Sequence, residues 1–365
     1  MAKLGEVCLL KAGKFVSAND ISPEYNKGLY PCFGGNGIRG YVADYTHDGE
    51  FPLIGRQGAL CGNVNLASGK FHATEHAVVV QPKIEMNVHW LYYALNAMNL
   101  GQYATGAAQP GLAVSKLETL SIEIPNISEQ NKIAQTLYKV EQLVNFRKQQ
   151  LAKLDELVKA RFVEMFGTFP ANPFRWSIGK IQDVVSDVRY GSSRPAVEGG
   201  KYPYLRMNNI TYSGELDLRD TKRIDIPDSE RDKCTVRRGD VLFNRTNSKE
   251  LVGKTCVYNR DELMVLAGFV IRVRINERIR PEVLSAFLNM DFSKRMLIGM
   301  CKTAIGQANI NAKELQNIDL YIPPIELQDQ FVTLKNKIDQ QKQTVQQSLE
   351  KLELLKKALM QEYFG

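Results

Sequence analysis

Residues 122–167 read IEIPNISEQNKIAQTLYKVEQLVNFRKQQLAKLDELVKARFVEMFG, and residues 320–365 read LYIPPIELQDQFVTLKNKIDQQKQTVQQSLEKLELLKKALMQEYFG. The two segments align without a gap at a constant offset of 198, and 16 of the 46 positions are identical. A repeat of this length indicates an internal duplication. We therefore expect four parts: a domain over 1–121, a helix in 122–167, a second domain over 168–319 and a second helix in 320–365.

Each copy of the repeat predicts one long helix, because its apolar residues recur at alternating spacings of four and three. The first stripe comprises Ile133, Leu137, Val140, Val144, Leu151, Leu154 and Val158, with Arg147 as a polar break. The second comprises Phe331, Ile338, Val345, Leu349, Leu352 and Leu359, with breaks at Lys335, Lys342 and Lys356. This spacing favours a coiled coil. We expect the first helix to have Ser128 as its N-cap and to end at Gly167.

An apolar stripe on an isolated helix must be covered, because apolar surface in water costs about 25 cal/mol per Å². The simplest cover is the other helix of the same chain, in an antiparallel pair with pseudo-twofold symmetry. The alternative is that each helix packs on its own domain. Two similar but non-identical domains held at a fixed distance suit a target with two sites along one axis, such as nucleic acid.

The remaining parts of the chain favour two β-rich domains, and with the helices they predict an α+β fold. Short apolar segments alternate with Gly- and Pro-containing turns. They include FPLIG (51–55), HAVVVQP (76–82), VLFNR (241–245), KTCVYN (254–259) and GFVIRVRI (268–275). One helix candidate lies late in each domain, at 88–98 and 281–290.

The two domains are related to each other as well as the two helices. The segment 3–7 resembles 180–184, Tyr30-Pro31 matches Tyr202-Pro203, Ile54-Gly55-Arg56 matches Phe243-Asn244-Arg245, and Thr105 and Gln109 match Thr303 and Gln307. The distance from Tyr-Pro to Arg is 25 residues in the first domain (31 to 56) and 42 in the second (203 to 245). The second domain therefore carries an insertion.

Composition sets broad limits on the class of protein. A net charge of +7 permits a polyanionic partner without requiring one. The cysteines form no C-x-x-C pair and lie far from His, so we expect scattered buried thiols rather than a zinc site; they are Cys8, Cys32, Cys61, Cys234, Cys256 and Cys301. We also expect no signal peptide, no membrane span and a cytoplasmic location.

No motif points firmly to catalysis. The G-x-G-x-x-G at 35–40 is not followed by a helix, so it predicts a tight β-turn in which Asn36 and Arg39 can face a ligand. His72 and His76 would suit a metal only in a helix, and their neighbours favour a strand or loop. Asp240 is typical of a turn before a strand. We expect no catalytic residue, no metal and no cofactor bound by this chain.

The polar residues that concentrate in the loops are of the types that read bases and phosphates. In the first domain the candidate DNA-binding residues are Lys14, Asn36, Arg39, Arg56, Gln57, Asn63 and Gln109. In the second they are Arg189, Tyr190, Ser192, Ser193, Arg194, Arg206, Asn208, Asn209, Asn244, Arg245, Asn247, Lys249, Lys302 and Gln307. The densest clusters are 190–194 and 244–249.

Taken in order, these motifs resemble those of the DNA specificity subunits of type I restriction–modification systems. The matching segments are Tyr30-Pro31 with Gly34-Gly35-Asn36-Gly37 and Gly40-Tyr41, Gly239-Asp240-Val241-Leu242-Phe243 with Arg245-Thr246 and Gly253-Lys254, the Thr-x₃-Gln segments at 105 and 303, and the helix entries Ile124-Pro125 with Glu129-Gln130 and Ile322-Pro323 with Leu327-Gln328. The resemblance covers essentially the whole chain. Its specificity lies in the duplicated order of the motifs.

The resemblance implies a non-catalytic subunit whose two target-recognition domains each read one half of a split site in double-stranded DNA. It implies that the paired helices set the spacer and dock two modification subunits, which carry S-adenosylmethionine and methylate adenine. Restriction subunits that use ATP and Mg for translocation and cleavage are a further implied partner. The alternative from another class is a coiled-coil scaffold whose end domains bind protein or glycan.

Overall fold

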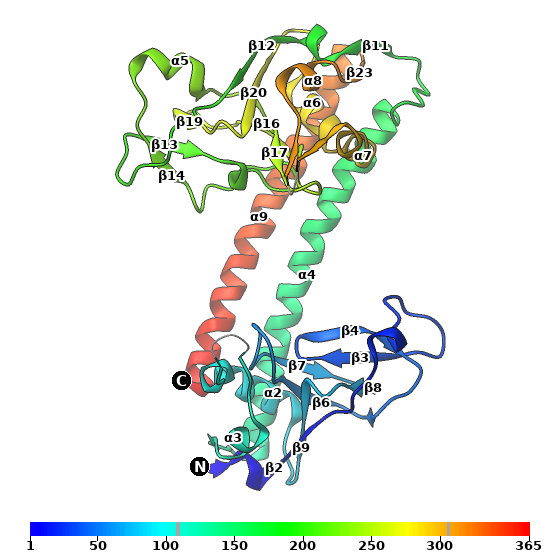
Figure 1. Ribbon diagram of the computed structural model, residues 1–365, viewed down its shortest axis with the longest axis vertical. Helices are drawn as coiled ribbons and strands as arrows, with labels where there is room; N and C mark the ends of the chain where they lie inside the picture. The colour runs from blue at the N-terminus through cyan, green and yellow to red at the C-terminus, as the bar shows by residue number, and fades with distance from the viewer. Residues whose placement is uncertain (107–109, 305–306) are drawn as a thin grey trace. The chain divides into compact units, whose positions relative to one another are not determined.

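The computed structural model describes residues 1–106, 110–304 and 307–365; for residues 302–304 and 307 it describes the backbone alone. These residues form two compact units (Figure 1). Unit 1 comprises residues 1–148 and 347–365, and unit 2 comprises residues 149–346. We call the β-rich part of unit 1 domain 1 and the β-rich part of unit 2 domain 2.

Over its described residues, domain 1 contains ten short strands and several short helices. The strands are β1 (Ala2–Lys3), β2 (Cys8–Ala12), β3 (Tyr30–Gly34), β4 (Gly37–Val42), β5 (His47–Asp48), β6 (Phe51–Gly55), β7 (Val64–Ala67), β8 (Lys70–Ala73), β9 (Ala77–Pro82) and β10 (Ser121–Ile122). The helices are α1 (Leu4–Val7), η1 (Ala18–Asp20), α2 (Val88–Ala97), η2 (Leu100–Tyr103) and α3 (Val114–Glu118). The predicted strand at 51–55 and the predicted helix near 88–98 are confirmed.

Domain 2 repeats this plan with additional elements. Its strands are β11 (Ser177–Lys180), β12 (Val185–Tyr190), β13 (Tyr202–Leu205), β14 (Lys222–Ile224), β15 (Thr235–Val236), β16 (Val241–Asn244), β17 (Thr246–Asn247), β18 (Thr255–Val257), β19 (Met264–Leu266), β20 (Val270–Ile275), β21 (Lys302–Ala304), β22 (Gln307–Asn309) and β23 (Asp319–Ile322). Its helices are η3 (Ile181–Val184), η4 (Met207–Asn209), η5 (Asp228–Glu230), α5 (Arg231–Cys234), α6 (Pro281–Asn289), α7 (Asp291–Met300) and α8 (Ala312–Gln316). The predicted helix at 281–290 corresponds to α6, whereas α7 was not predicted.

The sheets of the two domains have the same topology. One four-stranded sheet has the order β2-β9-β6-β7 in domain 1 and β12-β20-β16-β18 in domain 2. The other has the order β4-β3-β8-β5 in domain 1 and β14-β13-β19-β15 in domain 2, with one parallel pair in each, β3 with β8 and β13 with β19. The relationship between the domains that the sequence predicts is therefore confirmed.

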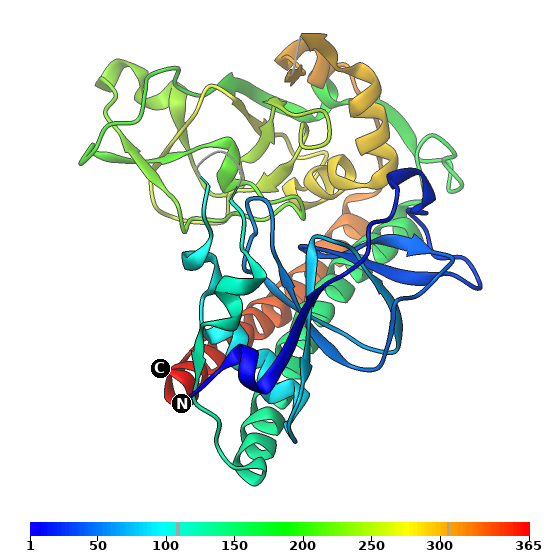
Figure 2. The same cartoon turned by 60° about the horizontal axis from the view of Figure 1, so that its bottom comes forward.

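The domains differ most in the segment that connects the strand beginning with Tyr-Pro (β3 or β13) to the strand paired with it (β4 or β14). In domain 1, β3 and β4 form a tight antiparallel hairpin, which both views show side by side (Figures 1 and 2). This turn is the predicted tight β-turn at Gly35–Gly40. In domain 2, residues 206–221 separate β13 from β14. Most of the predicted insertion lies in this segment.

The long helices are α4 (Ile127–Phe166) and α9 (Ile325–Phe364), each of 40 residues. The prediction that Ser128 caps the first helix is wrong. Asn126 Oδ1 accepts the hydrogen bond from Glu129 N at 3.0 Å, and α4 begins one residue before Ser128. Serine and asparagine both cap helices well. Because α4 begins at Ile127, directly after Asn126, the N-cap is Asn126 and not Ser128. Gly167, with φ of +82°, ends α4 as predicted.

In each unit the segments of α4 and α9 run antiparallel and contact each other. In unit 1, Lys356 Nζ lies 2.6 Å from Glu141 Oε1, and Lys148 Nζ lies 3.1 Å from Glu353 Oε1. In unit 2, Lys342 Nζ donates to the Asp155 carboxylate, and the rings of Phe162 and Phe331 lie 5.6 Å apart. That the pair forms a coiled coil stays a prediction.

The helices are also covered by the domains, as the alternative proposed. Ile133, Ala134 and Leu137 of α4 belong to the hydrophobic core of domain 1, and Leu359, Met360, Tyr363 and Phe364 of α9 pack against that core. In unit 2, Phe162 and Phe166 of α4 and Phe331 of α9 belong to the core of domain 2. Each domain core therefore contains residues from both long helices.

A buried glutamine joins the start of each long helix to its domain. Gln130 Oε1 accepts from Asn87 N at 2.9 Å, and its Nε2 donates to Pro125 O at 2.8 Å. The equivalent Gln328 accepts from Arg280 N at 2.8 Å and donates to Pro323 O at 2.8 Å. Each amide satisfies a backbone group at the start of the short helix α2 or α6, so the first turn of the long helix is fixed against the domain in the same unit.

One break in the second apolar stripe is a buried charge. Lys342 is 8 % exposed, and its Nζ donates to Asp155 on α4 and to Glu215 in the 206–221 segment. Burial alone would lower the pKa of Lys342, but the two carboxylates raise it above its ordinary value. The insertion of domain 2 is thus tied to both long helices within unit 2.

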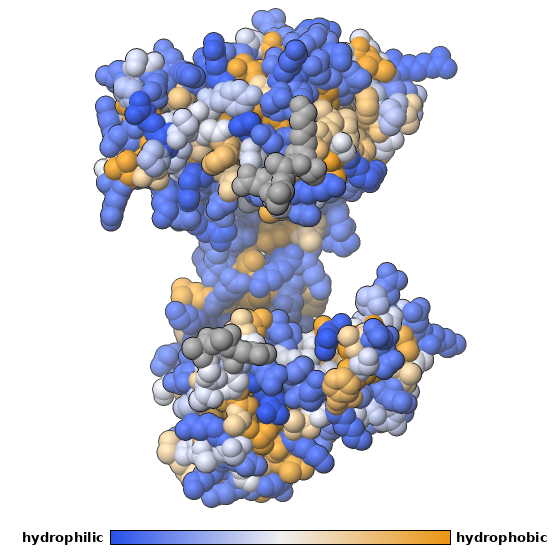
Figure 3. Space-filling view, viewed as in Figure 1, coloured by the Kyte–Doolittle hydropathy of each residue, from blue (hydrophilic) through white to orange (hydrophobic). Residues whose placement is uncertain are grey.

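Among the described residues, none of the helices has the length and apolar character that crossing a membrane requires. The face drawn in Figure 3 is largely hydrophilic, with apolar residues scattered between polar ones. All six cysteines are free; four are buried and two are half-buried.

Candidate nucleic-acid interface

Both domains carry the same set of backbone hydrogen bonds at one edge, where the ends of two strands meet a turn. In domain 1 the edge joins the ends of β2 and β6 with the turn between β8 and β9; in domain 2 it joins the ends of β12 and β16 with the turn between β19 and β20. We call it the arginine edge. It comprises Gly13, Lys14, Gly55, Arg56, Gln57, Asn63 and His76 in domain 1, and Gly191, Ser192, Asn244, Arg245, Thr246, Lys254 and Phe269 in domain 2.

The backbone of Arg56 and that of Arg245 are held in the same way. Arg56 N donates to His76 O at 3.0 Å, and Arg245 N donates to Phe269 O at 3.0 Å. Further hydrogen bonds match in the same way: Leu112 N–Arg56 O with Ile310 N–Arg245 O, Gly55 N–Asn63 O with Asn244 N–Lys254 O, Gly62 N–Gly55 O with Gly253 N–Asn244 O, and Lys14 N–Ala73 O with Ser192 N–Leu266 O. The predicted match of Ile54-Gly55-Arg56 with Phe243-Asn244-Arg245 is confirmed.

Gly13 and Gly191 occupy equivalent positions in the two arginine edges. At both positions the backbone of a neighbouring segment lies too close to leave room for a side chain. A Cβ on Gly13 would lie 2.0 Å from Ala73 O, and a Cβ on Gly191 would lie 2.1 Å from Leu266 O. These contacts involve backbone atoms, which cannot move aside as a flexible side chain can. Glycine at this position therefore lets β2 or β12 approach the turn of the neighbouring strand.

In domain 2 the arginine is held by an aromatic ring. The guanidinium carbon of Arg245 lies 4.9 Å from the centroid of the Tyr190 ring, an arrangement typical of a cation–π contact. Arg245 Nη1 lies 3.5 Å from Gly268 O, and no described group accepts a hydrogen bond from its buried Nε. Phe269, beside them on the turn, is 54 % exposed. The edge therefore presents a stacked arginine next to an exposed aromatic ring.

In domain 1 the β3–β4 turn packs onto the arginine edge. Gly35 O is so close to Gly55 that a Cβ on Gly55 would lie 1.9 Å from it. Asn63 Nδ2 donates to Asn36 Oδ1 at 2.8 Å, which brings the predicted turn residue Asn36 to the edge. No described group accepts from Arg56 Nε. The amides of Asn36 and Asn63 and the guanidinium group of Arg56 thus lie on the same exposed edge of domain 1.

Behind the arginine edge of domain 2 lies a buried polar cluster. Asn244 is 0 % exposed, and neither atom of its amide has a hydrogen-bond partner among the described residues. Lys294, 7 % exposed, donates from Nζ to Gly253 O and Asn289 Oδ1. Burial, together with the positive charges of Lys159 and Lys254, lowers the pKa of Lys294 from 10.5 to about 7. The cluster therefore contains a lysine that titrates near neutral pH.

We expect Lys294→Met to remove a pH dependence of stability. Between pH 7 and 10.5 the folded chain holds Lys294 neutral, while the unfolded chain still binds the proton, so the free energy of unfolding rises with pH by up to about 1.4 kcal/mol per unit. Below pH 7 both states are protonated and this dependence ends. Urea unfolding at pH 7 and 8.5 should show a wild-type gain of about 1.6 kcal/mol that Lys294→Met lacks, since Lys294 is already half neutral at pH 7. The exposed Lys313→Met is the control; an equal gain in wild type and Lys294→Met would contradict the assignment.

The comparisons with known proteins agree with this duplicated plan. A family model described as the type I restriction modification DNA specificity domain matches residues 1–156 and 175–354. The chain belongs to this family.

Individual relatives carry the same description. The chain is 53 % identical over 143 residues to the type I restriction enzyme EcoprrI specificity subunit of Escherichia coli, which is 39 % of this chain and 36 % of that protein. It is 22 % identical over 260 residues to the EcoKI specificity subunit of Escherichia coli strain K12, covering 67 % of this chain and 56 % of that protein. The matches thus span between about a third and somewhat over half of the length of these curated relatives.

Solved structures match the fold of this specificity-domain chain along its whole length. The S subunit of a type I restriction–modification system from M. genitalium aligns with a TM-score of 0.63 at 18 % identity, covering 100 % of this chain and 95 % of that one. A chain described in a study of complex assembly and conformational transition of the type I R-M system aligns with a TM-score of 0.56 at 17 % identity, covering 100 % and 96 %. The likeness shows that the mixed helix and strand architecture with two β-rich domains is that of S subunits.

The structure of this family member brings some of the predicted site residues together. Lys14, Asn36, Arg56, Gln57 and Asn63 meet at the arginine edge of domain 1. Tyr190, Ser192, Asn244, Arg245 and Asn247 meet at that of domain 2. Arg39 lies on β4, exposed and away from these hydrogen bonds. Gln109 lies outside the described residues, as do the side chains of Lys302 and Gln307.

Other predicted residues are engaged in contacts within domain 2. Arg194 pairs with Glu230 at 2.7 Å, and this hydrogen bond lowers the pKa of Glu230. Arg206 pairs with Asp220 at 2.9 Å. The buried Asn209 donates to Asp217 O at 2.8 Å and so fixes the 206–221 segment.

Arg189 pairs with Asp187 at 2.8 Å, and Asp187 also accepts from the buried Arg272 at 2.7 Å. Burial alone would raise the pKa of Asp187, but the hydrogen bonds from the two arginines lower it. Ser193 and Lys249 are exposed loop residues, and Asn208 is an exposed residue of η4. DNA contact by any of the predicted residues stays a prediction.

Sequence reasoning missed Phe269, the exposed ring of the domain 2 edge. The sequence pattern predicts one strand over 268–275, whereas β20 begins at Val270 and Phe269 belongs to the preceding turn. The match of His76 with Phe269 follows from the offset between β9 and β20, since both residues precede the first strand residue by one position. Aligning the strands as well as the motifs would have found it.

Proposed function

We propose that this chain is the DNA-recognition subunit of a type I restriction–modification complex, with each domain reading one half of a bipartite site in double-stranded DNA. One observation carries the proposal. The arginine edges share a backbone but expose different side chains. Lys14, Gln57 and Asn63 are exposed in domain 1, whereas in domain 2 the equivalent Ser192, Thr246 and Lys254 are buried and Phe269 is exposed. A common scaffold that presents two sets of base-reading residues suits a target with two different half-sites.

The chemistry of the edges fits DNA better than a small substrate. Arginine, asparagine and glutamine make paired hydrogen bonds to base edges, and lysine and serine bind phosphate oxygens. An exposed aromatic ring such as Phe269 can contact a thymine methyl group. The chain is proposed to be non-catalytic, with S-adenosylmethionine, ATP and Mg held by partner subunits.

The long helices are proposed to set the spacer between the half-sites. On α4, Glu141 and Asp155 lie 14 residues apart, and on α9 their partners Lys342 and Lys356 also lie 14 residues apart. Equal separations let both ion pairs form along helices of the same rise. A buried lysine such as Lys342 also specifies pairing, because any other alignment leaves its charge without a carboxylate.

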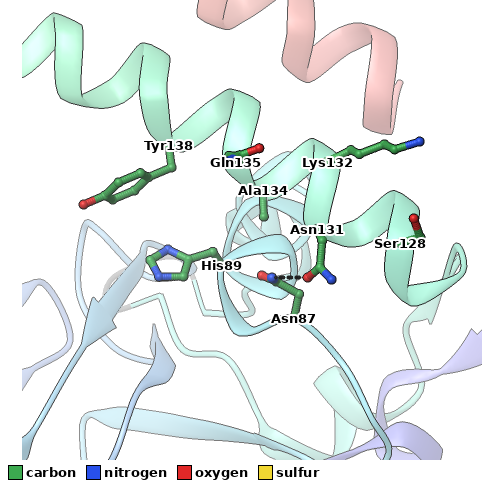
Figure 4. A pocket seen from close by; sticks show the side chains of 8 residues that line it. All are labelled: Asn87, His89, Ser128, Asn131, Lys132, Ala134, Gln135 and Tyr138. Carbon is green, nitrogen blue, oxygen red and sulfur yellow. Dashed lines mark hydrogen bonds between the residues drawn. The ribbon is translucent and has the colours of Figure 1, made fainter.

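Two modification subunits are proposed as partners because the first turns of α4 and α9 carry related grooves. One groove, of about 500 Å³, is lined by Asn87, His89, Ser128, Asn131, Lys132, Ala134, Gln135 and Tyr138 (Figure 4). The other, of about 390 Å³, is lined by Glu326, Asp329, Gln330, Thr333, Leu334 and Lys337. Positions 128, 131, 132 and 135 correspond to 326, 329, 330 and 333 at the offset of 198. A surface present twice suits a partner present twice.

Side chains that line the groove of unit 1 are held by contacts with one another. Figure 4 shows Asn87 hydrogen bonded to Asn131, with His89 and Tyr138 on the same side of the groove. The rings of His89 and Tyr138 lie 5.5 Å apart. A restriction subunit is a further proposed partner, and neither groove provides evidence for its binding site.

The test is sequence-dependent binding of duplex DNA. The chain is co-purified with modification subunits from the same host, and the complex is incubated with fragmented genomic DNA at 150 mM salt. The retained fragments should share one bipartite sequence. Retention without a shared sequence, or binding only of a protein or glycan, would favour the scaffold alternative.

A further inference from the structure

The arginine edge keeps one side chain unchanged between the two domains. Of its seven equivalent positions, all within the described residues, only the glycine and the arginine are the same in both. Glycine is needed at 13 and 191 because a Cβ would meet backbone oxygens at 2.0 or 2.1 Å. No such steric reason applies to Arg56 and Arg245, whose backbone hydrogen bonds would form with any residue except proline.

The arginines are not explained by internal ion pairs either. Arg189, Arg194, Arg206, Arg272 and Arg274 each have a carboxylate partner within domain 2. No carboxylate among the described residues pairs with Arg56 or Arg245, and the buried Nε of each lacks an acceptor. Both side chains are half-buried, so a buried Nε–H without an acceptor weakens the folded state. An external acceptor would offset that cost.

We propose that Arg56 and Arg245 each read one guanine, at the same position of their two half-sites counted from the adenine that is methylated. This inference rests on the proposed function and names the base-reading pair within it. Arginine pairs bidentately with guanine O6 and N7 more often than with any other base. Equivalent backbone positions in the same fold place the two guanidinium groups alike over their half-sites.

The two arginines differ in how firmly they are held. Arg245 stacks on Tyr190, whereas the residue equivalent to Tyr190 is Ala12, which precedes Gly13 as Tyr190 precedes Gly191. Tyr190 is itself fixed, because its hydroxyl accepts from Ala312 N at 2.8 Å. A pre-positioned arginine loses less conformational freedom on binding. Tyr190 is therefore a positioning residue, and domain 2 discriminates more strictly at its guanine than domain 1 does.

The experiment maps methylated adenines across a genome. The chain and its modification subunits are expressed in a strain that lacks adenine methylation, and long-read sequencing gives the modified sites. Arg245→Ala should relax the requirement for guanine at one position of one half-site by about tenfold or more and leave the other half-site unchanged. Arg56→Ala should do the same at the corresponding position of the other half-site.

Further variants distinguish a loss of folding from a loss of base recognition. Arg56→Gln and Arg245→Gln keep a long polar side chain and should shift the preference at those positions towards adenine. Tyr190→Leu should relax only the guanine read by Arg245, while Tyr190→Phe, which keeps the ring and loses only the hydrogen bond from Ala312 N, should relax it less. Thermal unfolding of each complex identifies variants that fail to fold, and for those the glutamine variants give the result.

Several outcomes would overturn the inference. An equal loss of methylation at all sites would mark the arginines as phosphate contacts. Relaxed positions at different distances from the methylated adenine would show that the two domains do not use equivalent residues. If wild type itself gave no sequence-dependent methylation, the proposed function would fail before the arginines were tested.

Discussion

Inserting four residues into both long helices, after Arg147 of α4 and after Val345 of α9, is expected to lengthen the recognised spacer by one or two base pairs. Four residues add about 6 Å to a helix, and the bases of duplex DNA are spaced by about 3.4 Å. The insertion points correspond at the offset of 198, and both lie between the two ion pairs Glu141–Lys356 and Asp155–Lys342. Both pairs can therefore still form.

Mapping of methylated adenines checks this result. The half-site sequences should be unchanged, because the insertion leaves both arginine edges intact. The mismatched control carries the insertion in α4 alone, which makes 18 residues separate Glu141 from Asp155 while 14 separate their partners. Only one ion pair can then form, and we expect a lower melting temperature. Changed half-sites with an unchanged spacer would disprove the role of the helices.

Replacing Gly191 with valine is expected to abolish recognition by domain 2. A Cβ at this position would lie 2.1 Å from Leu266 O and 2.4 Å from Ala267 O. Because these are backbone atoms of β19 and its turn, the strand must shift, at a cost of about 3 kcal/mol or more. We expect a melting temperature lower by roughly 10 °C and methylation that no longer depends on one half-site.

The matched control is Gly299→Ala on α7, where no atom lies within 4 Å of a new Cβ. This variant should unfold within a few degrees of wild type and keep both half-sites. Gly13→Val should repeat the defect in domain 1, because its Cβ would lie 2.0 Å from Ala73 O. Normal stability of Gly191→Val would mean that the approach of β12 to the turn is not required.

Repetition made the duplicated features predictable from the sequence. The long helices, the equivalence of Arg56 with Arg245 and the pairing of Tyr30-Pro31 with Tyr202-Pro203 all follow from aligning the chain with itself. The strand at 51–55 was also predictable, because a short apolar run between turn residues is too short for a helix and usually forms a strand.

Features without a counterpart or without local periodicity were missed. Helix α7 carries the polar residues Ser293 and Lys294 on its buried face, so they interrupt the apolar stripe that Phe292, Met296, Leu297 and Met300 form against the core. The roles of Arg194 and Arg206 depend on Glu230 and Asp220, whose distance in the sequence gives no sign of contact. Loop arginines that hold the fold together and those that face a ligand look alike until their partners are known.

The packing of Phe364 has a consequence for how the protein is made. Its ring lies 6.4 Å from that of Trp90, and Leu359, Met360 and Tyr363 pack against the same core. During translation, the residues of domain 1 emerge well before these four. The core of domain 1 can therefore reach its final packing only after α9 has been synthesised. Early release of the chain before residue 359 would leave Trp90 and its neighbours exposed and prone to aggregation.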